Sequence, residues 1–387
     1  MSLISAENAM AVMAALFVIA GLGFVAEKTR VGAQLTGAVI AIVTAIAAAN
    51  LNIIPHSSPA YDFVFSYFVP ILIPLFLFKA DLKRLMFETT RTTMAFLLAS
   101  VGTVAGVTLA ALSLDLTSLG ALAPLAMEQR EAAVAGLFAS TYIGGSVNYA
   151  ALGEVTGLSQ DASFFSAATA ADNLFSAVYL GLLALLPGWR WLAQKYQPHD
   201  HSFKVDELED KQPITAMSLV LALAAAMVIV AVGDAVLAYI GGSGWRYIVI
   251  TVLSLVLATL APALVERMAG SFELGVGLSF VFFAAIAAGA DVVAMVQVAP
   301  LLIALVLILL SMHFVVTFTL GRWLGLSMPE LITASNAAIL GATTAPALAA
   351  AKGWNNLITP GILVGVFGYA LGTFVGTFIF KFWGLFL

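Results

Sequence analysis

The sequence predicts an all-helical membrane protein that crosses the bilayer many times. Of its 387 residues, 62% are hydrophobic and only 10% are charged, against roughly 25% charged in soluble domains. Apolar stretches of about 20 residues, the length that spans a bilayer as a helix, recur along the whole chain. Two of these stretches are broken by glycine at corresponding places in the two halves. We therefore expect two inverted repeats, each with about five transmembrane helices plus one broken or re-entrant element.

The two predicted repeats are separated by a polar stretch. Residues 1–187 form the first repeat, 188–215 a polar cytoplasmic connector with the longest run of charged residues, and 216–387 the second repeat. Each repeat contains six apolar segments. They lie at about 7–26, 31–51, 61–79, 93–114, 131–158 and 162–187, and at about 216–240, 245–262, 270–290, 299–321, 329–354 and 357–384.

The fifth segment of each half has the composition of a helix that breaks. The two segments align when Gly145 is placed on Gly341, a shift of 196 positions. In lipid, a broken helix persists only where protein or a water-filled cavity satisfies the freed backbone groups. Matched interruptions in two halves point to the binding site of a secondary transporter, whereas the alternative is that small residues merely allow close helix packing. The expected substrate-binding residues are Gly144, Gly145, Ser146, Asn148, Tyr149, Gly341, Thr343, Thr344 and Pro346.

The distribution of lysine and arginine indicates how the broken segments sit in the membrane. If both segments cross, the 16 basic residues divide evenly between the two sides, which violates the positive-inside rule. If each segment is a re-entrant hairpin, thirteen of the 16 fall on one side. That topology has ten spanning helices, an inverted second half and both termini outside. The alternative keeps broken helices that cross, with one span miscounted elsewhere.

An ionisable residue lies near the middle of the segment 162–187. A carboxylate such as Asp172 at that depth costs about 3 kcal/mol and is by default a functional candidate. Hard cations prefer oxygen ligands, so we expect a coupling ion, sodium or a proton, with Na⁺ bound at Asp172. The alternative is a buried aspartate that hydrogen-bonds to a neighbouring helix. The expected ion-binding residues are Asp172, Asn173, Thr169 and Asn336.

Several other polar positions have simpler explanations. His313 lies well inside its span and would relay protons if it titrates near neutral pH, but a lone membrane histidine more often bonds across helices. Glu154 and Glu330 flank the two broken segments, where we expect solvated side chains. His199 and His201 have the composition of a metal site, but their position in the connector favours a solvated linker.

The two-half organisation and the glycine-broken stretches around Gly145 and Gly341 resemble the YjcL-like family of uncharacterised membrane proteins. That family is grouped with sodium/proton antiporters and with bile-acid, glutamate and citrate symporters. The resemblance covers nearly the whole chain. It implies a transport domain that carries the interrupted elements and moves against a scaffold, within a homodimer. The pair Asp172 and Asn173 is similar, in reversed order, to the acid–amide pair with which sodium/proton antiporters bind ions.

The sequence therefore predicts a sodium-coupled, elevator-type secondary active transporter for a small anionic or zwitterionic metabolite. The alternative is a sodium/proton antiporter without an organic substrate. No spacing typical of intramembrane catalytic residues is present, so we expect neither enzyme activity nor an organic cofactor. The net charge of −5 and the lack of a basic run argue against nucleic-acid binding. We expect a multi-pass protein of the inner (cytoplasmic) membrane whose partners are a small-molecule substrate, lipid and a second copy.

Overall fold

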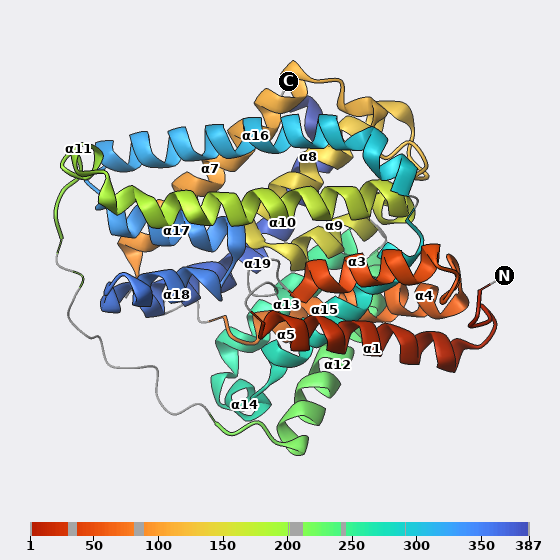
Figure 1. Ribbon diagram of the computed structural model, residues 1–387. Helices are drawn as coiled ribbons and strands as arrows, with labels where there is room; N and C mark the ends of the chain where they lie inside the picture. Colours follow the sequence, from red (N-terminus) through yellow and green to blue (C-terminus); the bar gives the residue numbers. More distant parts are fainter. Residues whose placement is uncertain are drawn as a thin grey trace.

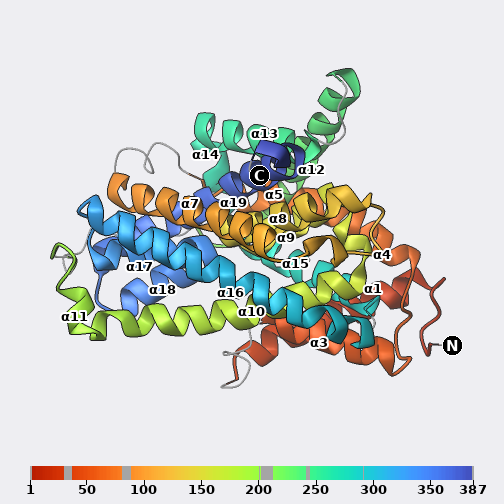
Figure 2. The ribbon, with the colours of Figure 1, turned by 90° about the horizontal axis from the view of Figure 1, so that it is seen from above.

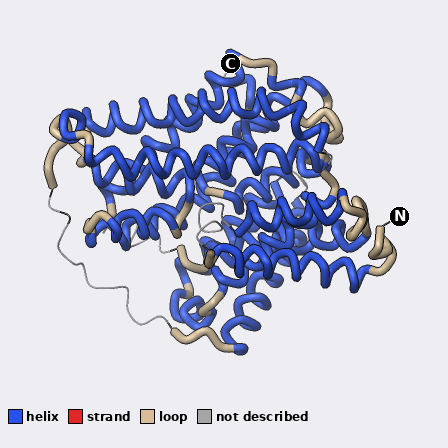
Figure 3. Tube along the Cα trace, in the orientation of Figure 1, coloured by secondary structure: helices blue, strands red, loops and turns tan. Residues whose placement is uncertain are grey.

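The computed structural model describes residues 2–29, 37–80, 89–199, 201, 212–240, 245–290 and 292–385, and every regular element in these ranges is helical (Figures 1 and 3). Eight helices are long and apolar enough to cross a membrane, and a pair bent by 99° makes a ninth candidate. A shorter apolar helix covers Gly37–Asn50. The prediction of an all-helical polytopic membrane protein is confirmed.

The helices follow the order of the predicted segments. The first half forms α1 (Ala9–Glu27), α3 (Gly37–Asn50), α4 (Pro59–Phe63), a π-helical turn (Val64–Phe68), α5 (Val69–Leu77), α7 (Thr90–Ser113), α8 (Met127–Gly144), α9 (Ser146–Thr156) and α10 (Ala162–Leu185). The connector contains the short α11 (Arg190–Ala193). The second half forms α12 (Ala216–Ile240), α13 (Arg246–Leu260), α14 (Pro262–Val265), α15 (Ser271–Ala288), α16 (Val292–Trp323), α17 (Met328–Leu340), α18 (Thr344–Ala351) and α19 (Ile358–Lys381).

The helices pack in two groups (Figures 1 and 2). The hairpin group contains α7, α8, α9, α10, α16, α17, α18 and α19. The flanking group contains α1, α3, α4, α5, α12, α13, α14 and α15. Each group takes elements from both halves of the sequence, the last ones of each half in the hairpin group and the first ones in the flanking group. The predicted repeats 1–187 and 216–387, on either side of the connector 188–215, thus each contribute helices to both groups.

Local signals in the sequence begin and end the helices around the first break. Gly157, with φ +77°, adopts the left-handed conformation that ends α9. The Asp161 side chain then accepts a hydrogen bond from the Phe164 backbone N–H at 3.0 Å and caps the start of α10. The chain thus leaves α9 and enters α10 through a short, defined turn.

Both broken segments fold back on themselves. The first consists of α8 and α9, here called hairpin 1, and the second of α17 and α18, here called hairpin 2. A methyl group at Gly376 would touch both Gly136 and Leu152, which would lie about 24 Å apart in a straight helix. A methyl group at Gly361 would likewise touch both Thr333 and Pro346, about 20 Å apart in a straight helix. Each segment is therefore a helical hairpin.

The two hairpins reach α19 from its opposite ends. The built methyl positions at Gly372 and Gly376 meet the body of hairpin 1, whereas that at Gly361 meets the body of hairpin 2. Between them, the hairpin 1 tip lies against Gly368 and the hairpin 2 tip against Gly365. Glycines let these backbones approach closely. The two tips consequently meet within one turn of α19, hairpin 2 toward the left of Figure 1 and hairpin 1 toward the right.

Candidate functional site

Both hairpins turn at a glycine with nearly the same backbone conformation. Gly145 has φ 73° and ψ −169°, and Gly341 has φ 87° and ψ −169°. This region of backbone space is open essentially to glycine alone. Each glycine N–H still closes the last turn of the first helix, donating to Thr141 O at 2.7 Å in hairpin 1 and to Ala337 O at 3.0 Å in hairpin 2. The local sequence thus fixes where each helix breaks.

A polar pair crosses each hairpin just behind its tip. In hairpin 1, Ser140 Oγ donates to the backbone oxygen of Asn148 at 3.4 Å. In hairpin 2, Asn336 Nδ2 donates to the backbone oxygen of Thr344 at 3.2 Å, and Thr344 Oγ1 donates to Asn336 Oδ1 at 2.8 Å. Donors and acceptors in the two hairpins are 196 residues apart, the same spacing as the two glycines. The sequence predicted Asn336 as an ion ligand; the structure places it across the hairpin 2 tip.

An exposed residue follows each of the two breaking glycines. From Ala132 to Gly153 every residue is buried except Ser146, which directly follows the breaking glycine. In hairpin 2 the first exposed residue after the break is Thr343, and Thr344 is partly exposed. Ser146 and Thr343 are therefore the residues near the two tips that other protein atoms leave uncovered.

Asp172 lies on α10 beside hairpin 1. Its Oδ1 accepts a hydrogen bond from Ser176 Oγ at 3.3 Å. The Tyr142 hydroxyl lies close enough to interact with the Asp172 carboxyl. It is fully buried and, like the Thr141 hydroxyl, makes no hydrogen bond of good geometry with any described residue. A carboxylate with nearby unsatisfied hydroxyl oxygens is a donor set that a hard cation or a proton can complete.

The other ion ligands predicted on α10 bond to their own helix. Asn173 Nδ2 donates to Thr169 O at 2.8 Å, and Thr169 Oγ1 donates to Phe165 O at 2.8 Å. These bonds use the N–H and O–H donors, so the Asn173 side-chain oxygen and the Thr169 lone pairs stay available to a ligand. Asn173 is partly exposed and Thr169 is buried.

Asn148, predicted as a substrate ligand, joins hairpin 1 to α19. Its Nδ2 donates to Gly368 O at 3.1 Å, and its Oδ1 accepts from Thr373 Oγ1 at 2.7 Å. Tyr149 points the other way, because its hydroxyl donates to Phe165 O at 2.6 Å and its ring packs on the Phe165 ring. The structure therefore gives both side chains partners within the protein.

A buried chain of hydrogen bonds links hairpin 2 to hairpin 1 through His313. Tyr179 Oη and His313 Nε2 contact Ser335 Oγ on α17 at 2.8 and 2.9 Å. His313 Nδ1 contacts Thr103 Oγ1 on α7 at 2.9 Å. Thr103 Oγ1 in turn lies 3.1 Å from the Tyr142 backbone oxygen, whose helical partner is lost at the break.

One assignment of protons satisfies this chain. If Thr103 donates to the Tyr142 oxygen, then His313 carries its proton on Nδ1 and donates to Thr103, and its Nε2 accepts from Ser335, which accepts from Tyr179. In the reverse direction Tyr179 has no acceptor among the described residues. This chain of hydrogen bonds ends on the backbone oxygen of Tyr142, which cannot pass a proton on. The chain therefore braces the two hairpins and does not form a continuous proton path. The expectation that His313 bonds across helices is confirmed.

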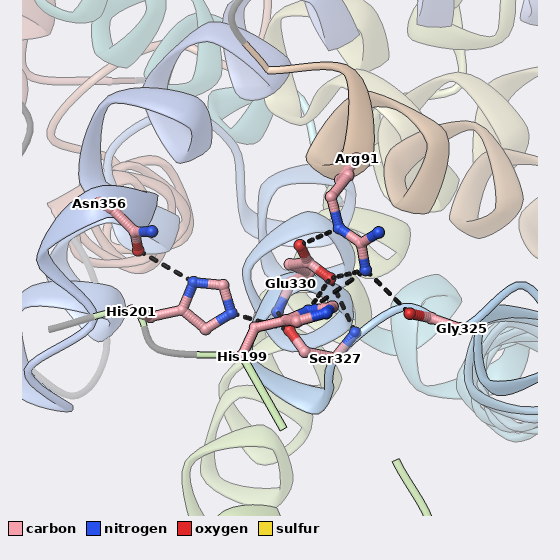
Figure 4. A network of polar contacts seen from close by, with 7 residues as sticks. All are labelled: Arg91, His199, His201, Gly325, Ser327, Glu330 and Asn356. Carbon is pink, nitrogen blue, oxygen red and sulfur yellow. Dashed lines mark hydrogen bonds and ion pairs between the residues drawn. The ribbon is translucent and has the colours of Figure 1, made fainter. Parts of the chain in front are cut away.

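A second polar cluster closes the base of hairpin 2 (Figure 4). Arg91 Nε donates to Glu330 Oε1 at 2.6 Å, and the Arg91 guanidinium also donates to Gly325 O at 2.8 Å. Glu330 Oε2 accepts from the Ser327 backbone N–H at 2.7 Å in a capping box that starts α17. The Glu330 side chain is 4% exposed, so the expectation of a solvated residue was wrong. The positive charge of Arg91 compensates the free-energy cost of burying the Glu330 carboxylate.

The connector joins this cluster through His201. Its Nε2 lies 2.9 Å from Ser327 Oγ, and its Nδ1 lies 3.0 Å from Asn356 Oδ1, just beyond the end of α18. Burial lowers the pKa of His201 below its ordinary value. The neutral ring accepts from Ser327 and donates to Asn356, so one side chain ties the two ends of hairpin 2 together. We call the cluster of Arg91, His199, His201, Ser327, Glu330 and Asn356 the clasp.

The clasp has the composition of a metal site, but the guanidinium of Arg91 already supplies a positive charge there. Ligand atoms of His199, His201 and Glu330 lie within 4.8 Å of one another. The Arg91 guanidinium, however, also contacts His199 Nδ1 at 3.2 Å and so occupies the position between histidine and carboxylate. A divalent ion there would face the Arg91 charge. The expectation of a solvated linker is wrong for His201, which is buried and docked on hairpin 2.

Sequence reasoning missed several polar residues that hold the site together. Thr103 and Thr373 each follow a glycine, Gly102 and Gly372, that lets two helices approach closely. A hydroxyl residue beside a packing glycine is the signal that would have pointed to both. Ser335 directly precedes Asn336, but it contacts His313 whereas Asn336 contacts Thr344. The sequence alone does not show which helix Ser335 faces, so its role could be seen only in the fold.

Comparison with known proteins identifies relatives along nearly the whole chain. Residues 14–384 match the family described as "Protein of unknown function (DUF819)". The chain is also 32% identical, over 385 residues and 93% of each protein, to the "Uncharacterized membrane protein YjcL" of Bacillus subtilis (strain 168). Neither description gives an activity. The chain is therefore a multi-pass membrane protein that belongs to the DUF819 family.

Proposed function

We propose that this protein is a cation-coupled secondary active transporter of the elevator type, built from two inverted repeats. The observation that carries the proposal is the meeting of two glycine-broken hairpins, which approach from opposite ends of α19, beside the carboxylate of Asp172. Opposed broken helices near a bundle centre are the usual architecture of a transporter's binding site. The similar backbone angles at Gly145 and Gly341 support an evolutionary duplication of one unit.

Asp172 is proposed to bind the coupling cation. No lysine or arginine among the described residues forms an ion pair with it, and a carboxylate at this depth is costly unless it is neutralised. Sodium or a proton would neutralise it, and Tyr142, Ser176, Thr169 and Asn173 would supply nearby oxygens. The first N–H groups of α9 and α18 have no intrahelical partner and would receive the anionic end of a small anionic or zwitterionic substrate.

Coupling between ion and substrate would pass through Tyr142. Its hydroxyl faces Asp172, while its backbone oxygen lies at the hairpin 1 tip and receives the brace from Thr103, His313 and Ser335. A cation at Asp172 that draws in the Tyr142 hydroxyl would therefore favour one arrangement of both tips. By linkage, the substrate would raise the affinity for the cation by the same factor. The hairpin group would then move against the flanking group, in a homodimer of the inner membrane.

Thermal unfolding of the purified protein tests this proposal. Sodium chloride is compared with potassium chloride at equal ionic strength, in the wild type, in Asp172→Asn and in Asp115→Asn, a surface control. Sodium at a hundredfold excess over its dissociation constant stabilises the native state by about 2.7 kcal/mol. We expect this gain in the wild type and the control and its loss in Asp172→Asn. A full sodium response in Asp172→Asn would overturn the proposed ion site.

The alternative function is sodium/proton antiport without an organic substrate. It is favoured by Asp172 itself, a titratable group that one sodium ion or one proton can neutralise. In proteoliposomes an outward sodium gradient alone would then drive proton entry. Sodium-driven proton flux that persists without any added metabolite supports antiport, whereas uptake of a metabolite only in the presence of sodium supports symport.

A further inference from the structure

A polar cavity of about 590 Å³ lies between the two helix groups. Its lining helix α4 lies at the same end of the molecule as the N-terminus (Figure 1). One wall comes from the flanking group, through α4, the π-helical turn and the end of α15. The other wall comes from the hairpin group, through the end of α9 in hairpin 1 and the start of α10. The cavity is therefore bounded by both groups that an elevator would move past each other.

The charged side chains that line this cavity are both acidic. Asp62 stands on the flanking wall and Glu154 on the hairpin wall, and no lysine or arginine is among the described lining residues. Arg246 is close enough to act on Glu154, but its guanidinium is held by Asp234 at 2.6 and 2.8 Å. The cavity thus has a negative potential that favours a cationic group.

Asp62 and Glu154 differ in how far their own partners satisfy them. Glu154 Oε1 accepts a hydrogen bond from Ser159 Oγ at 2.7 Å, which orients the carboxylate at the hairpin wall. Asp62 makes no hydrogen bond or ion pair with any residue that the structure describes and is exposed to the cavity side. A cation placed between the two walls would give Asp62 the partner that the protein does not supply.

The size and lining of the cavity indicate an organic cation. A volume near 590 Å³ lies within the range of about 300–1,000 Å³ for small-molecule sites and far exceeds the space that a bare ion needs. Phe65 and Ser66 line it from the π-helical turn Val64–Phe68. Such turns occur frequently at functional sites, and an aromatic ring beside carboxylates suits an alkylammonium group.

We propose that this cavity is the entrance for the transported solute and that the solute carries an ammonium group. The inference rests on the proposed transport function and narrows its expected substrate from anionic or zwitterionic to zwitterionic. The ammonium group would first meet Asp62 and Glu154. From there the solute would move about 12 Å along α9, the helical rise between Glu154 and Ser146, to bring its carboxylate to the hairpin 1 tip.

Charge-selective labelling of single cysteines tests the proposal. The sequence contains no cysteine, so Ser66→Cys places one thiol in the cavity. Its rates of reaction with cationic 2-(trimethylammonium)ethyl methanethiosulfonate and anionic 2-sulfonatoethyl methanethiosulfonate are compared. Ser118→Cys, exposed and close to both Asp115 and Arg130, is the control. We expect the cation-to-anion rate ratio at Ser66→Cys to exceed that at the control about tenfold.

Removing both carboxylates should abolish this preference. In Asp62→Asn/Glu154→Gln the ratio at Ser66→Cys should fall to the control value, and tetramethylammonium, but not acetate, should slow labelling only while both acids are present. Equal ratios at cavity and control, or a preference that survives the double substitution, would overturn the inference. Ser57→Cys repeats the measurement from a second lining position.

The labelling result is independent of transport. If the cavity prefers cations but Asp172→Asn keeps its sodium response, the entrance assignment stands and the ion site fails. If the sodium response depends on Asp172 but the cavity shows no preference, the transporter proposal stands and the ammonium assignment fails.

Discussion

Hairpin 1 and hairpin 2 have the same break but different surroundings. Hairpin 1 is buried on both arms and is fixed to α19 by Asn148, with hydrogen bonds to Gly368 O and Thr373 Oγ1. Hairpin 2 has a second arm, α18, on which Ala347 and Ala350 are exposed. Local sequence sets the break in both hairpins, while the surrounding helices decide which hairpin is free to move.

This difference assigns separate roles to the two hairpins. Segments with few buried contacts open at lower free energy than fully packed ones. Hairpin 1 is therefore expected to act as a fixed wall beside Asp172. Hairpin 2, held at its base by the clasp and at its body by the brace through His313, is expected to be the gate.

The largest expected effect comes from adding one methyl group to α19 on the hairpin 1 side. In Gly372→Ala the new Cβ would collide with Asn148 Nδ2 and lie 2.7 Å from Ser140 O, so hairpin 1 must shift. In Gly361→Ala the closest atom, Thr333 Cγ2 of hairpin 2, is 3.0 Å away. Overpacking at Gly372 should cost about 3 kcal/mol and at Gly361 less than about 1 kcal/mol. Unfolding in detergent measures both, and equal losses would contradict the assigned rigidity.

Removing the amide that fixes hairpin 1 should have the next largest effect. Asn148→Ala removes the side-chain donor to Gly368 O in a fully buried place and leaves the Thr373 hydroxyl with only the Tyr369 backbone oxygen as acceptor, at about 2 kcal/mol. Asn336→Ala frees mainly Thr344, which is partly exposed and can bond to water, at about 1 kcal/mol. Chemical denaturation compares the pair. A larger loss in Asn336→Ala would reverse the roles of the two hairpins.

The breaking glycines should respond alike. A Cβ at Gly145 would meet no atom within 4 Å, and one at Gly341 only the Tyr369 hydroxyl at 3.7 Å. Gly145→Ala and Gly341→Ala therefore test backbone strain alone, at about 2 kcal/mol each. Gly181→Ala, in the helix α10 with equally open space, is the matched control and should be neutral or stabilising. Losses at Gly145 and Gly341 that differ widely would show that the breaks are not equivalent.

The smallest effect concerns pH at the clasp. Because burial lowers the pKa of His201, the neutral ring stabilises the folded state above the ordinary histidine pKa of about 6.5. That contribution is lost as the pH falls from there through the lowered pKa. Between pH 7.5 and 5.5, the free energy of unfolding should fall further in the wild type than in His201→Asn. The difference between the two decreases should be below about 1 kcal/mol. The midpoint of thermal unfolding at each pH measures this. Identical pH profiles would show that His201 does not help to hold the two ends of hairpin 2 together.

The parts of the site set by local sequence could be predicted, and the parts set by distant packing could not. Gly145 and Gly341 impose a turn that any neighbour must accept, so the breaks were visible in the chain. Glu330 was expected to be solvated because it flanks the second broken segment, yet its partner Arg91 lies 239 residues earlier. Asn148 was predicted to bind substrate because its internal partner Thr373 lies 225 residues later and could not be recognised from the sequence. Polar side chains carry no signal of which helix will cover them.

The most direct test of the central claim measures how sodium changes access to the two tips. Ser146→Cys and Thr343→Cys place single thiols on the exposed residues of hairpin 1 and hairpin 2, and maleimide labelling rates are read with sodium or potassium. If a cation at Asp172 closes hairpin 2 against hairpin 1, sodium slows labelling at Thr343→Cys several-fold, changes Ser146→Cys little, and has no effect once Asp172→Asn is added. Labelling at Thr343→Cys that ignores sodium, or that still responds to it in Asp172→Asn, would contradict the account.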